Sequence, residues 1–278
     1  MGYVLPRSGR PVVCVEQGAS PISAIAVPPS IAWSLPTLFR WSRRSVARIV
    51  AVSEENKRTL VNLYRLPADK ITVVHNGADL TLFAEPLPGT LRQELGLTPD
   101  QPLIIVLGRL SPNKGQQYLV QAAPAILARF PTAHFVFAGN PSGRAPLEDS
   151  IRAAGLESHF SLIGFRTDVA NLLRSSDLFV LPSLAEGFSL SIVEALAAGL
   201  PVIATRVGGA AEIIQDGREG FLVPPADPEA LAQAVSCVLG LDLASKEHIR
   251  QAARARSASF SIATTAQKML DIYADAAG

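Results

Sequence analysis

Residues 103–115 have the sequence LIIVLGRLSPNKG, and this stretch decides the fold class. Its first part, Leu103–Leu107, is an unbroken apolar run, which is typical of a strand buried on both faces of a sheet. A polar loop with a glycine at each end follows, and Gln116–Arg129 then has the apolar spacing expected of a helix. A buried strand, a loop and a helix in succession predict one unit of a parallel α/β sheet.

The same alternation of apolar runs and helical segments continues along most of the chain. We expect the other strands at Val12–Val15, Ile49–Val52, Ile71–Val74, His134–Ala138, Phe160–Ile163, Leu178–Leu181, Val202–Ala204 and Phe221–Val223. Further helices are expected at Leu147–Ala154, Ser189–Ala198, Pro228–Leu239, Leu243–Arg256 and Ser261–Ala274. Strands of this kind, joined by crossover helices, form doubly wound sheets.

The distribution of these elements predicts two unequal domains. Residues 76–100 are rich in proline and poor in apolar runs, so we expect a linker there. Residues 101–241 contain six expected strands, enough for a complete doubly wound domain, whereas residues 1–75 contain three, which is few for such a layer. The two helices within residues 242–278 are not followed by an expected strand, so they do not connect strands of a sheet. We expect them to pack back across both domains.

The composition excludes several classes of protein. With 278 residues, 48% of them hydrophobic, and a net charge of +1, the chain can bury a core but has no overall charge to attract nucleic acid. Neither Cys14 nor Cys237 lies in a C-x-x-C pair, and the first residues lack the apolar run of a signal peptide, so we expect a reducing, cytoplasmic environment. The four histidines are scattered and no Asp-x-Asp pair occurs, so we expect no metal and no other cofactor.

Residues 17–48 are the segment in which a membrane contact is conceivable. No charged residue occurs in Gln17–Phe39, and four arginines follow at positions 40, 43, 44 and 48. Prolines at positions 21, 28, 29 and 36 divide the apolar part, which argues against a membrane span. The remaining interpretations are a peripheral contact with anionic lipid at the inner face of the membrane, or an irregular and partly buried loop.

The loop that follows Leu107 carries the first candidate functional residues. In open parallel sheets, ligands bind beyond the carboxyl ends of the strands. Glycine at Gly108 lets the backbone approach a ligand, and Arg109 and Lys114 place two cations at that edge. Such a pair can hold a diphosphate and neutralise the charge that develops as it leaves. The alternative is that both cations are solvated surface residues near a tight turn.

A second group of candidates follows Leu178–Leu181. The expected helix begins near Ser189, and its first free amide groups, at residues 189–191, suit an anion. Glu186 precedes this helix and Glu194 lies eight residues later, so both can face one cleft, where a carboxylate can accept bonds from sugar or ribose hydroxyls. Considered alone, Glu186 is better explained as a capping acid and Glu194 as a surface acid. A glycosidase would also use two carboxylates but would leave the amides unused.

Two more motifs have simpler structural explanations. The pair Gly208-Gly209 permits close approach to a ligand, but Glu212 alone is best explained as an acid in the first turn of a helix. His75-Asn76-Gly77 contains a turn signal at the end of the first domain, where we expect a crossing between domains. His75 is accordingly interpreted as structural rather than catalytic.

Together, these motifs resemble those of the retaining glycosyltransferases of family 4, which have the two-domain GT-B fold. The resemblance runs from about Pro11 to Tyr273 and is strongest in residues 71–230. The matching elements are Ser53-Glu54, His75-Asn76-Gly77-Ala78-Asp79, Gly108-Arg109-Leu110 with Lys114-Gly115, Glu186 with Glu194, Gly208-Gly209 with Glu212, and Asp216-Gly217 through Gly220. It implies a complete C-terminal Rossmann-like domain that binds the donor and a truncated N-terminal Rossmann-like domain on the acceptor side.

The resemblance also implies roles for particular residues. Arg109 and Lys114 would bind the diphosphate of a UDP- or GDP-sugar without a metal, Glu186 would contact the transferred sugar, and Glu194 would hold the ribose. Further donor-binding positions would be Gly108, Asn140, Phe165, Gly187, Phe188, Ser189, Leu190 and Ser191. Members of this family transfer a hexose with retention to a glycan, a lipid or a small molecule, and the leaving diphosphate helps to deprotonate the acceptor.

Three departures from the family pattern occur, and the first two of them favour a second hypothesis. The first domain has fewer strands than usual, Gln17 stands where a histidine is common, and Ala211 stands where proline is usual. Glutamine cannot act as an acid or a base. The alternative to an active enzyme is therefore a catalytically impaired module that binds a nucleotide sugar. An oxidoreductase is disfavoured because no Gly-x-Gly-x-x-Gly turn follows a strand.

Overall fold

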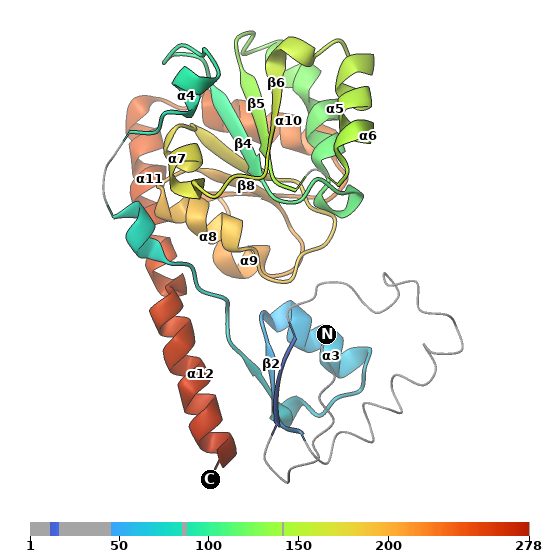
Figure 1. The fold of residues 1–278 in the computed structure, drawn as a ribbon, viewed down its shortest axis with the longest axis vertical. Helices are drawn as coiled ribbons and strands as arrows, with labels where there is room; N and C mark the ends of the chain where they lie inside the picture. The colour runs from blue at the N-terminus through green and yellow to red at the C-terminus, as the bar shows by residue number, and fades with distance from the viewer. Residues whose placement is uncertain (1–11, 17–45, 85–87, 141, 278) are drawn as a thin grey trace, which may run out of the picture.

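A computed structural model describes residues 12–16, 46–84, 88–140 and 142–277 of the chain. These residues form an α/β protein with two parallel sheets (Figure 1). One sheet has six strands in the order β6-β5-β4-β7-β8-β9, and the other has three in the order β1-β2-β3. We call the first sheet with its covering helices the six-stranded unit, and the second sheet with helix α3 the three-stranded unit. The expected fold class is confirmed.

The strands lie where the apolar runs predict them. They are β1 (Val12–Glu16), β2 (Val46–Ala51), β3 (Ile71–Val73), β4 (Leu103–Leu107), β5 (His134–Ala138), β6 (Phe160–Gly164), β7 (Leu178–Leu181), β8 (Val202–Thr205) and β9 (Gly220–Val223). The largest difference from the prediction is in β2, which begins three residues before Ile49. Arg48 interrupts the apolar pattern there, so the sequence alone does not show these first residues as part of the strand.

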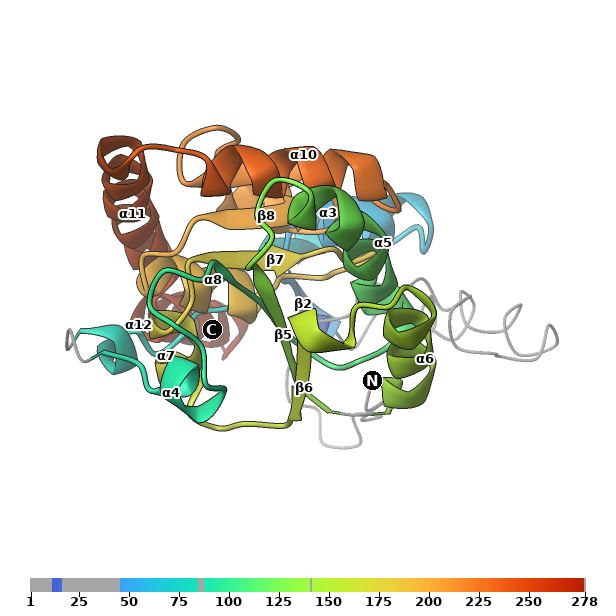
Figure 2. The ribbon, with the colours of Figure 1, turned by 90° about the horizontal axis from the view of Figure 1, so that it is seen from above.

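Helices cover both faces of the six-stranded sheet (Figure 2). On one face lie α5 (Gln116–Leu127), α6 (Arg144–Ala153) and α10 (Pro228–Leu239), and on the other lie α7 (Val169–Arg174), α8 (Leu190–Ala197) and α11 (Leu243–Ser257). All residues of β4, β5, β7 and β8 are buried. Successive residues of β4 belong to opposite cores, since Ile104 packs with the α5 side and Ile105 with the α8 side.

The strand order reverses between β4 and β7, which is where a ligand crevice is expected in an open parallel sheet. From β4 the chain moves outward through β5 and β6, and it then crosses over to build β7, β8 and β9 on the other side. Ligands bind outside the carboxyl ends of the strands at such a reversal. The loops that follow β4 and β7 are the two that the sequence singles out, so the topology brings both groups of candidate residues to this crevice.

The three-stranded unit is small and is completed by the end of the described chain. Helix α3 (Glu54–Asn62) covers the sheet through a cluster that contains Ile49, Leu60 and Ile71. Helix α11 packs on α8, and α12 (Ile262–Ala277) runs back to lie beside β1 and β2 (Figure 1). The remaining helical turns are α4 (Leu91–Glu94), α9 (Ala210–Ile213), η2 (Ala68–Lys70), η3 (Leu80–Phe83), η4 (Pro112–Lys114), η5 (Glu157–His159) and η6 (Ala258–Phe260).

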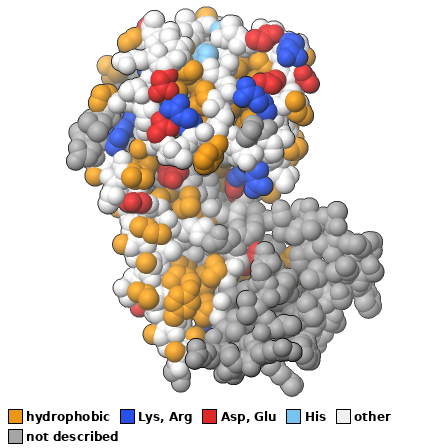
Figure 3. Space-filling view, in the orientation of Figure 1, with side chains coloured by type: hydrophobic (Ala, Val, Ile, Leu, Met, Phe, Trp, Pro, Cys, Tyr) orange, Lys and Arg blue, Asp and Glu red, His pale blue; other side chains and the backbone are white. Residues whose placement is uncertain are grey.

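The surface shows charges of both signs on the six-stranded unit and apolar side chains near α12 (Figure 3). Exposed apolar residues around the three-stranded sheet include Val15, Leu270 and Tyr273. No helix in the described ranges is both long and apolar enough to cross a membrane.

The segment expected to contact a membrane, residues 17–48, lies mostly outside the described residues, as does Gln17. Arg48 is described, and its guanidinium lies 2.6 Å from the Asp275 carboxylate on α12. This arginine therefore forms an ion pair within the protein.

Candidate active site

The loop after β4 is shaped by glycine at two points. The Gly108 amide donates to the Ala138 carbonyl, and the Leu110 amide donates to the Asn140 carbonyl, so the ends of β4 and β5 stay together. The turn η4 then ends at Gly115, whose φ is 67°. A Cβ atom on Gly115 would lie 1.9 Å from the Pro182 carbonyl oxygen, in the loop after β7. Only glycine therefore lets the two loops pass this closely.

The same two loops hold an ion pair between Lys114 and Glu186. The Lys114 Nζ lies 2.5 Å from Glu186 Oε1, and Ser183 Oγ donates to the same oxygen at 2.7 Å. The side chains of Lys114 and Glu186 are only 24% and 10% exposed. An ammonium group has three N–H donors, so Lys114 keeps donors for a ligand, and Glu186 Oε2 makes no described hydrogen bond. The sequence alone indicates no role for Ser183, apart from its place just after β7.

Helix α8 presents free amide groups beside this ion pair. The side chain of its N-cap residue, Ser189, accepts no bond from a backbone amide of the helix, and the Ser189 hydroxyl pairs with the Ser191 hydroxyl at 2.9 Å. The first amides of α8 therefore have no side-chain acceptor among the described residues. Such a helix start is a suitable site for an anion.

Glu194 lies further along α8 and is half-buried. No hydrogen bond or ion pair reaches its carboxylate from the described residues. Burial raises the pKa of Glu194 above its usual range. Hydroxyl groups of a ligand would stabilise the ionised form of such a carboxylate, because they would replace the lost water as hydrogen-bond donors.

A hollow of about 240 Å³ lies at the carboxyl ends of β4, β5 and β6. Its wall includes the expected donor-binding residues Gly108, Arg109, Asn140 and Phe165, and the Phe165 side chain is 73% exposed. Arg166 also lines it, but this guanidinium is bound to two carboxylates, those of Asp168 and Glu94. Arg109 makes no ion pair with a described residue. An exposed aromatic ring beside an arginine suits a flat, partly apolar group such as a base.

The structure thus brings some of the predicted residues into direct contact and places others only nearby. Lys114 and Glu186 are in direct contact, whereas Arg109 lies in the adjoining hollow, and no described bond links it to Lys114. Phe188 contributes only its backbone to the loop, since its ring is buried and stacks on His75 at 4.9 Å. Gly187, also buried, accepts a bond from the Gly209 amide. Leu190 is 39% exposed at the helix start.

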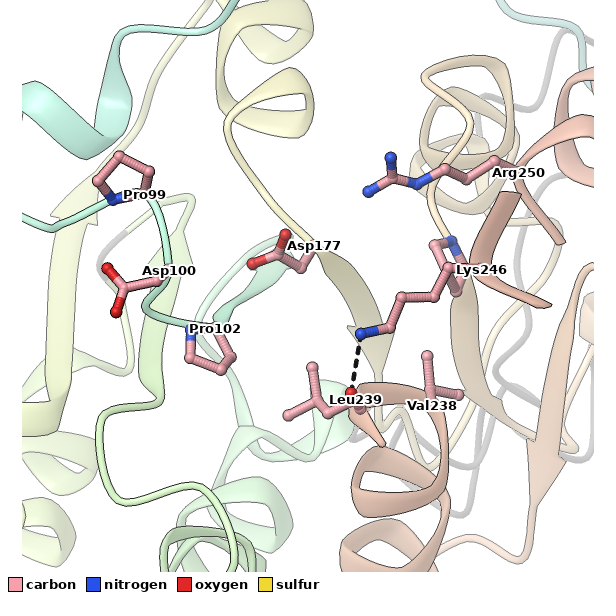
Figure 4. A pocket seen from close by; sticks show the side chains of 9 residues that line it. Pro99, Asp100, Pro102, Asp177, Val238, Leu239, Lys246 and Arg250 are labelled. Atoms are coloured by element: carbon pink, nitrogen blue, oxygen red, sulfur yellow. Dashed lines mark hydrogen bonds between the residues drawn. The ribbon is translucent and has the colours of Figure 1, made fainter. Parts of the chain in front are cut away.

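A second hollow, of about 130 Å³, lies at the opposite edge of the sheet (Figure 4). It is formed near the amino ends of β4, β7 and β8 and carries charges of both signs, including Asp177 and Lys246. Asp177 is held by Arg92 at 2.6 Å, and the Lys246 ammonium donates to the Leu239 carbonyl at 2.9 Å. These charges bind groups of the protein. No trio of potential metal ligands gathers anywhere in the described parts of the chain.

Comparisons with known proteins identify the family of the chain. Residues 89–256 match the family of glycosyl transferases group 1, and residues 1–82 match glycosyltransferase family 4. A D-inositol 3-phosphate glycosyltransferase of Nocardia farcinica is 34% identical over 241 residues, which are 82% of this chain and 52% of that protein. An uncharacterized glycosyltransferase of Methanocaldococcus jannaschii, MJ1607, is 34% identical over 209 residues, which are 73% and 53% of the two chains.

A solved structure is similar over nearly the whole chain. The structure of Anabaena Alr3699/HepE in complex with UDP-glucose superposes with a TM-score of 0.84 at 27% identity, and covers 96% of this chain and 72% of its own. This chain spans about half the length of the curated relatives it matches. The two family matches and the shared fold show that the chain belongs to the family 4 (group 1) glycosyltransferases, with a GT-B-like fold.

Proposed function

We propose that this chain binds a nucleoside diphosphate sugar in the crevice between β4 and β7 and transfers the sugar, with retention, to a glycan, lipid or small-molecule acceptor. The observation that carries the proposal is the Lys114–Glu186 ion pair beside the uncapped start of α8. The relative HepE was solved with UDP and with UDP-glucose, which supports a uridine donor over a guanosine donor.

The diphosphate would lie between cations and helix amides. Lys114 has N–H donors left after it binds Glu186, and Arg109, directly after β4, makes no ion pair with a described residue. Together with the first amides of α8, these groups neutralise the charge that grows on the diphosphate as the sugar departs. This arrangement provides charge stabilisation from the protein alone.

The two carboxylates would recognise different hydroxyl groups. Glu186 is anchored through Oε1 by Lys114 and Ser183, so its free Oε2 can accept a bond from the transferred sugar. Glu194, without a described partner, would accept the ribose hydroxyls. The base would lie in the hollow beside Phe165.

The role of Glu186 can be tested by comparing two ligands. We expect Glu186→Gln to weaken the binding of the nucleotide sugar about tenfold, and that of the nucleoside diphosphate less than about threefold. The reason is that only the sugar contacts Glu186, whereas loss of the negative charge leaves Lys114 free for the diphosphate. Calorimetry with both ligands measures the difference. Glu148→Gln, at an exposed acid in α6, serves as the control, and equal losses for both ligands would contradict the assignment.

The assignment of Glu194 predicts a pH dependence. Ribose hydroxyls donate to the ionised carboxylate, so the bound state favours loss of the proton, while burial raises the pKa of Glu194 in the free protein. Affinity for a nucleotide sugar should therefore rise as the pH increases through this raised pKa, and should level off above it. Calorimetry at a series of pH values measures the rise, and Glu194→Gln should flatten it. A flat profile for the unmodified protein would be evidence against the ribose contact.

A second candidate function is a module that binds the donor without turnover. It is favoured by Gln17, which stands where a histidine is common in the family, because glutamine cannot act as an acid or a base. Thermal shifts with a panel of nucleotide sugars would identify base and sugar, because ligand binding raises apparent stability. Product formation with glycan or lipid acceptors then separates the two functions, since only an enzyme releases the nucleoside diphosphate in proportion to product.

A further inference from the structure

One carboxylate joins the two units of the protein. Glu212, in the short helix α9, accepts the backbone N–H of Glu54 at 2.9 and 3.0 Å and that of Glu55 at 3.3 Å. These are the first two residues of α3 in the three-stranded unit. The carboxylate also reaches a residue just beyond β3 at the same edge of this sheet, because Glu212 Oε2 lies 2.8 Å from His75 Nε2. Three motifs that the proposed function leaves unused, at residues 53–54, 75 and 212, therefore meet at one point.

Glu212 is held in place from its own side as well. The Arg256 guanidinium donates to the Glu212 carbonyl at 2.5 Å and to the Ile213 carbonyl at 2.8 Å, and it lies 4.9 Å from the centre of the Phe260 ring. Helix α9 has only four residues, so these bonds supply much of what fixes its orientation. The carboxylate is thus aimed at α3 by contacts that belong to the six-stranded unit.

The same junction contacts the loop that contains Glu186. The Gly209 amide donates to the Gly187 carbonyl at 2.8 Å, and a Cβ atom on Gly208, which has a φ of 56°, would lie 2.1 Å from the Glu186 carbonyl oxygen. On the other side, the ring of His75 stacks on that of Phe188. The glycine pair before α9 and the Glu212 partner His75 therefore contact the donor loop, residues 186–188, from the two units.

The surroundings of the Glu212 carboxylate stabilise its negative charge. Burial acts to raise its pKa, but the hydrogen bonds from His75 and from the Glu54 and Glu55 amides outweigh burial and lower it. The start of α3 also favours a negative charge. Glu212 is consequently ionised at neutral pH, and a neutral or shortened side chain would leave several donors without an acceptor.

We propose that Glu212 is a positioning residue that fixes the start of α3 and His75 of the three-stranded unit against the donor loop 186–188. This inference rests on the proposed function, because it assigns the contact a role in transfer. Glu212 itself makes no described bond to Lys114, Glu186 or Glu194, the groups assigned to the donor. It therefore acts on the placement of the acceptor side, and should influence turnover far more than nucleotide binding.

The contact itself can be tested by hydrogen exchange, which needs no activity. In Glu212→Ala, the amides of Glu54 and Glu55 should exchange at least about tenfold faster than in the unmodified protein. The Asn56 amide is an internal reference, because Ser53 Oγ accepts it at 3.0 Å and this bond stays. Glu229→Ala, at an exposed acid in the first turn of α10, is the matched control and should change neither amide. Unchanged exchange in Glu212→Ala would overturn the proposal.

The role in transfer is tested by separating kcat from the donor KM. Glu212→Ala should lower kcat about tenfold or more and leave the affinity for the nucleoside diphosphate within about twofold. Glu212→Gln keeps one acceptor oxygen and should recover part of both the protection and the rate. Faster exchange with an unchanged kcat would reduce Glu212 to a structural contact and overturn its positioning role. Absence of product from the unmodified protein would refute the proposed function, while the exchange measurement would still decide the contact.

Discussion

Gly115→Ala is expected to lower the free energy of unfolding by about 3 kcal/mol or more and to reduce donor binding severely. Two costs combine at this position. A side chain is strained at a φ of 67°, and its Cβ would lie 1.9 Å from the Pro182 carbonyl oxygen, a backbone atom that cannot rotate away. The loops after β4 and β7 must then separate, and Lys114 moves away from Glu186. Urea unfolding and calorimetry with a nucleotide sugar measure the two effects.

Gly155→Ala provides a control for this prediction. Gly155 has the same φ of 67°, but nothing lies within 4 Å of its added Cβ. Only the conformational cost of about 1–2 kcal/mol should appear, with donor affinity unchanged. If the two variants lost equal stability and kept equal affinity, the close passage of the loops would not be what glycine provides at Gly115.

Lys114→Ala is expected to weaken nucleotide-sugar binding by roughly 1.5–3 kcal/mol, or about 10- to 150-fold, because it removes charge-assisted hydrogen bonds. It also leaves the Glu186 carboxylate, only 10% exposed, near the ligand diphosphate without its cation. Arg109→Ala should have an effect in the same range but nearer its lower end, since Arg109 is more exposed. Calorimetry with the nucleotide sugar gives both values.

The control for Lys114 is a lysine at the opposite edge of the sheet. Lys246→Ala removes a cation from the hollow of about 130 Å³ at the amino ends of the strands (Figure 4) and should leave nucleotide-sugar affinity unchanged. Weaker binding in Lys246→Ala, together with normal binding in Lys114→Ala, would place the ligand at the amino ends of the strands. That result would contradict the proposed function.

The fold was largely predictable because its strands are encoded locally. The bounds of β4 and β7 agree with the apolar runs, which polar, glycine or proline residues interrupt on either side. In β2 the charged Arg48 hides the beginning of the strand. The order of strands is set by packing between distant segments, and local patterns carry no direct signal for it.

In the candidate site, too, the positions of residues could be predicted from the sequence, whereas their contacts could not. The positions of Lys114 and Glu186 at strand ends follow from the sequence, but their contact joins residues 72 apart and depends on β4 lying beside β7. Glu212 was interpreted as an acid of its own short helix, whereas its carboxylate binds the start of α3, 158 residues away. His75, interpreted as structural, contacts Glu212 and Phe188. Contacts between residues so far apart in the chain appear only once the strands or units that they join have packed together.

The return of α12 to β1 and β2 has a consequence for biosynthesis. The ribosome makes the strands of the three-stranded sheet before it makes any of the six-stranded unit, yet the helix that lies beside β1 and β2 is translated after that unit is complete. The earliest strands must therefore wait, partly uncovered, while the later and larger core folds. During this interval they are open to chaperones and to mispairing, and docking of α12 is the event that ends it.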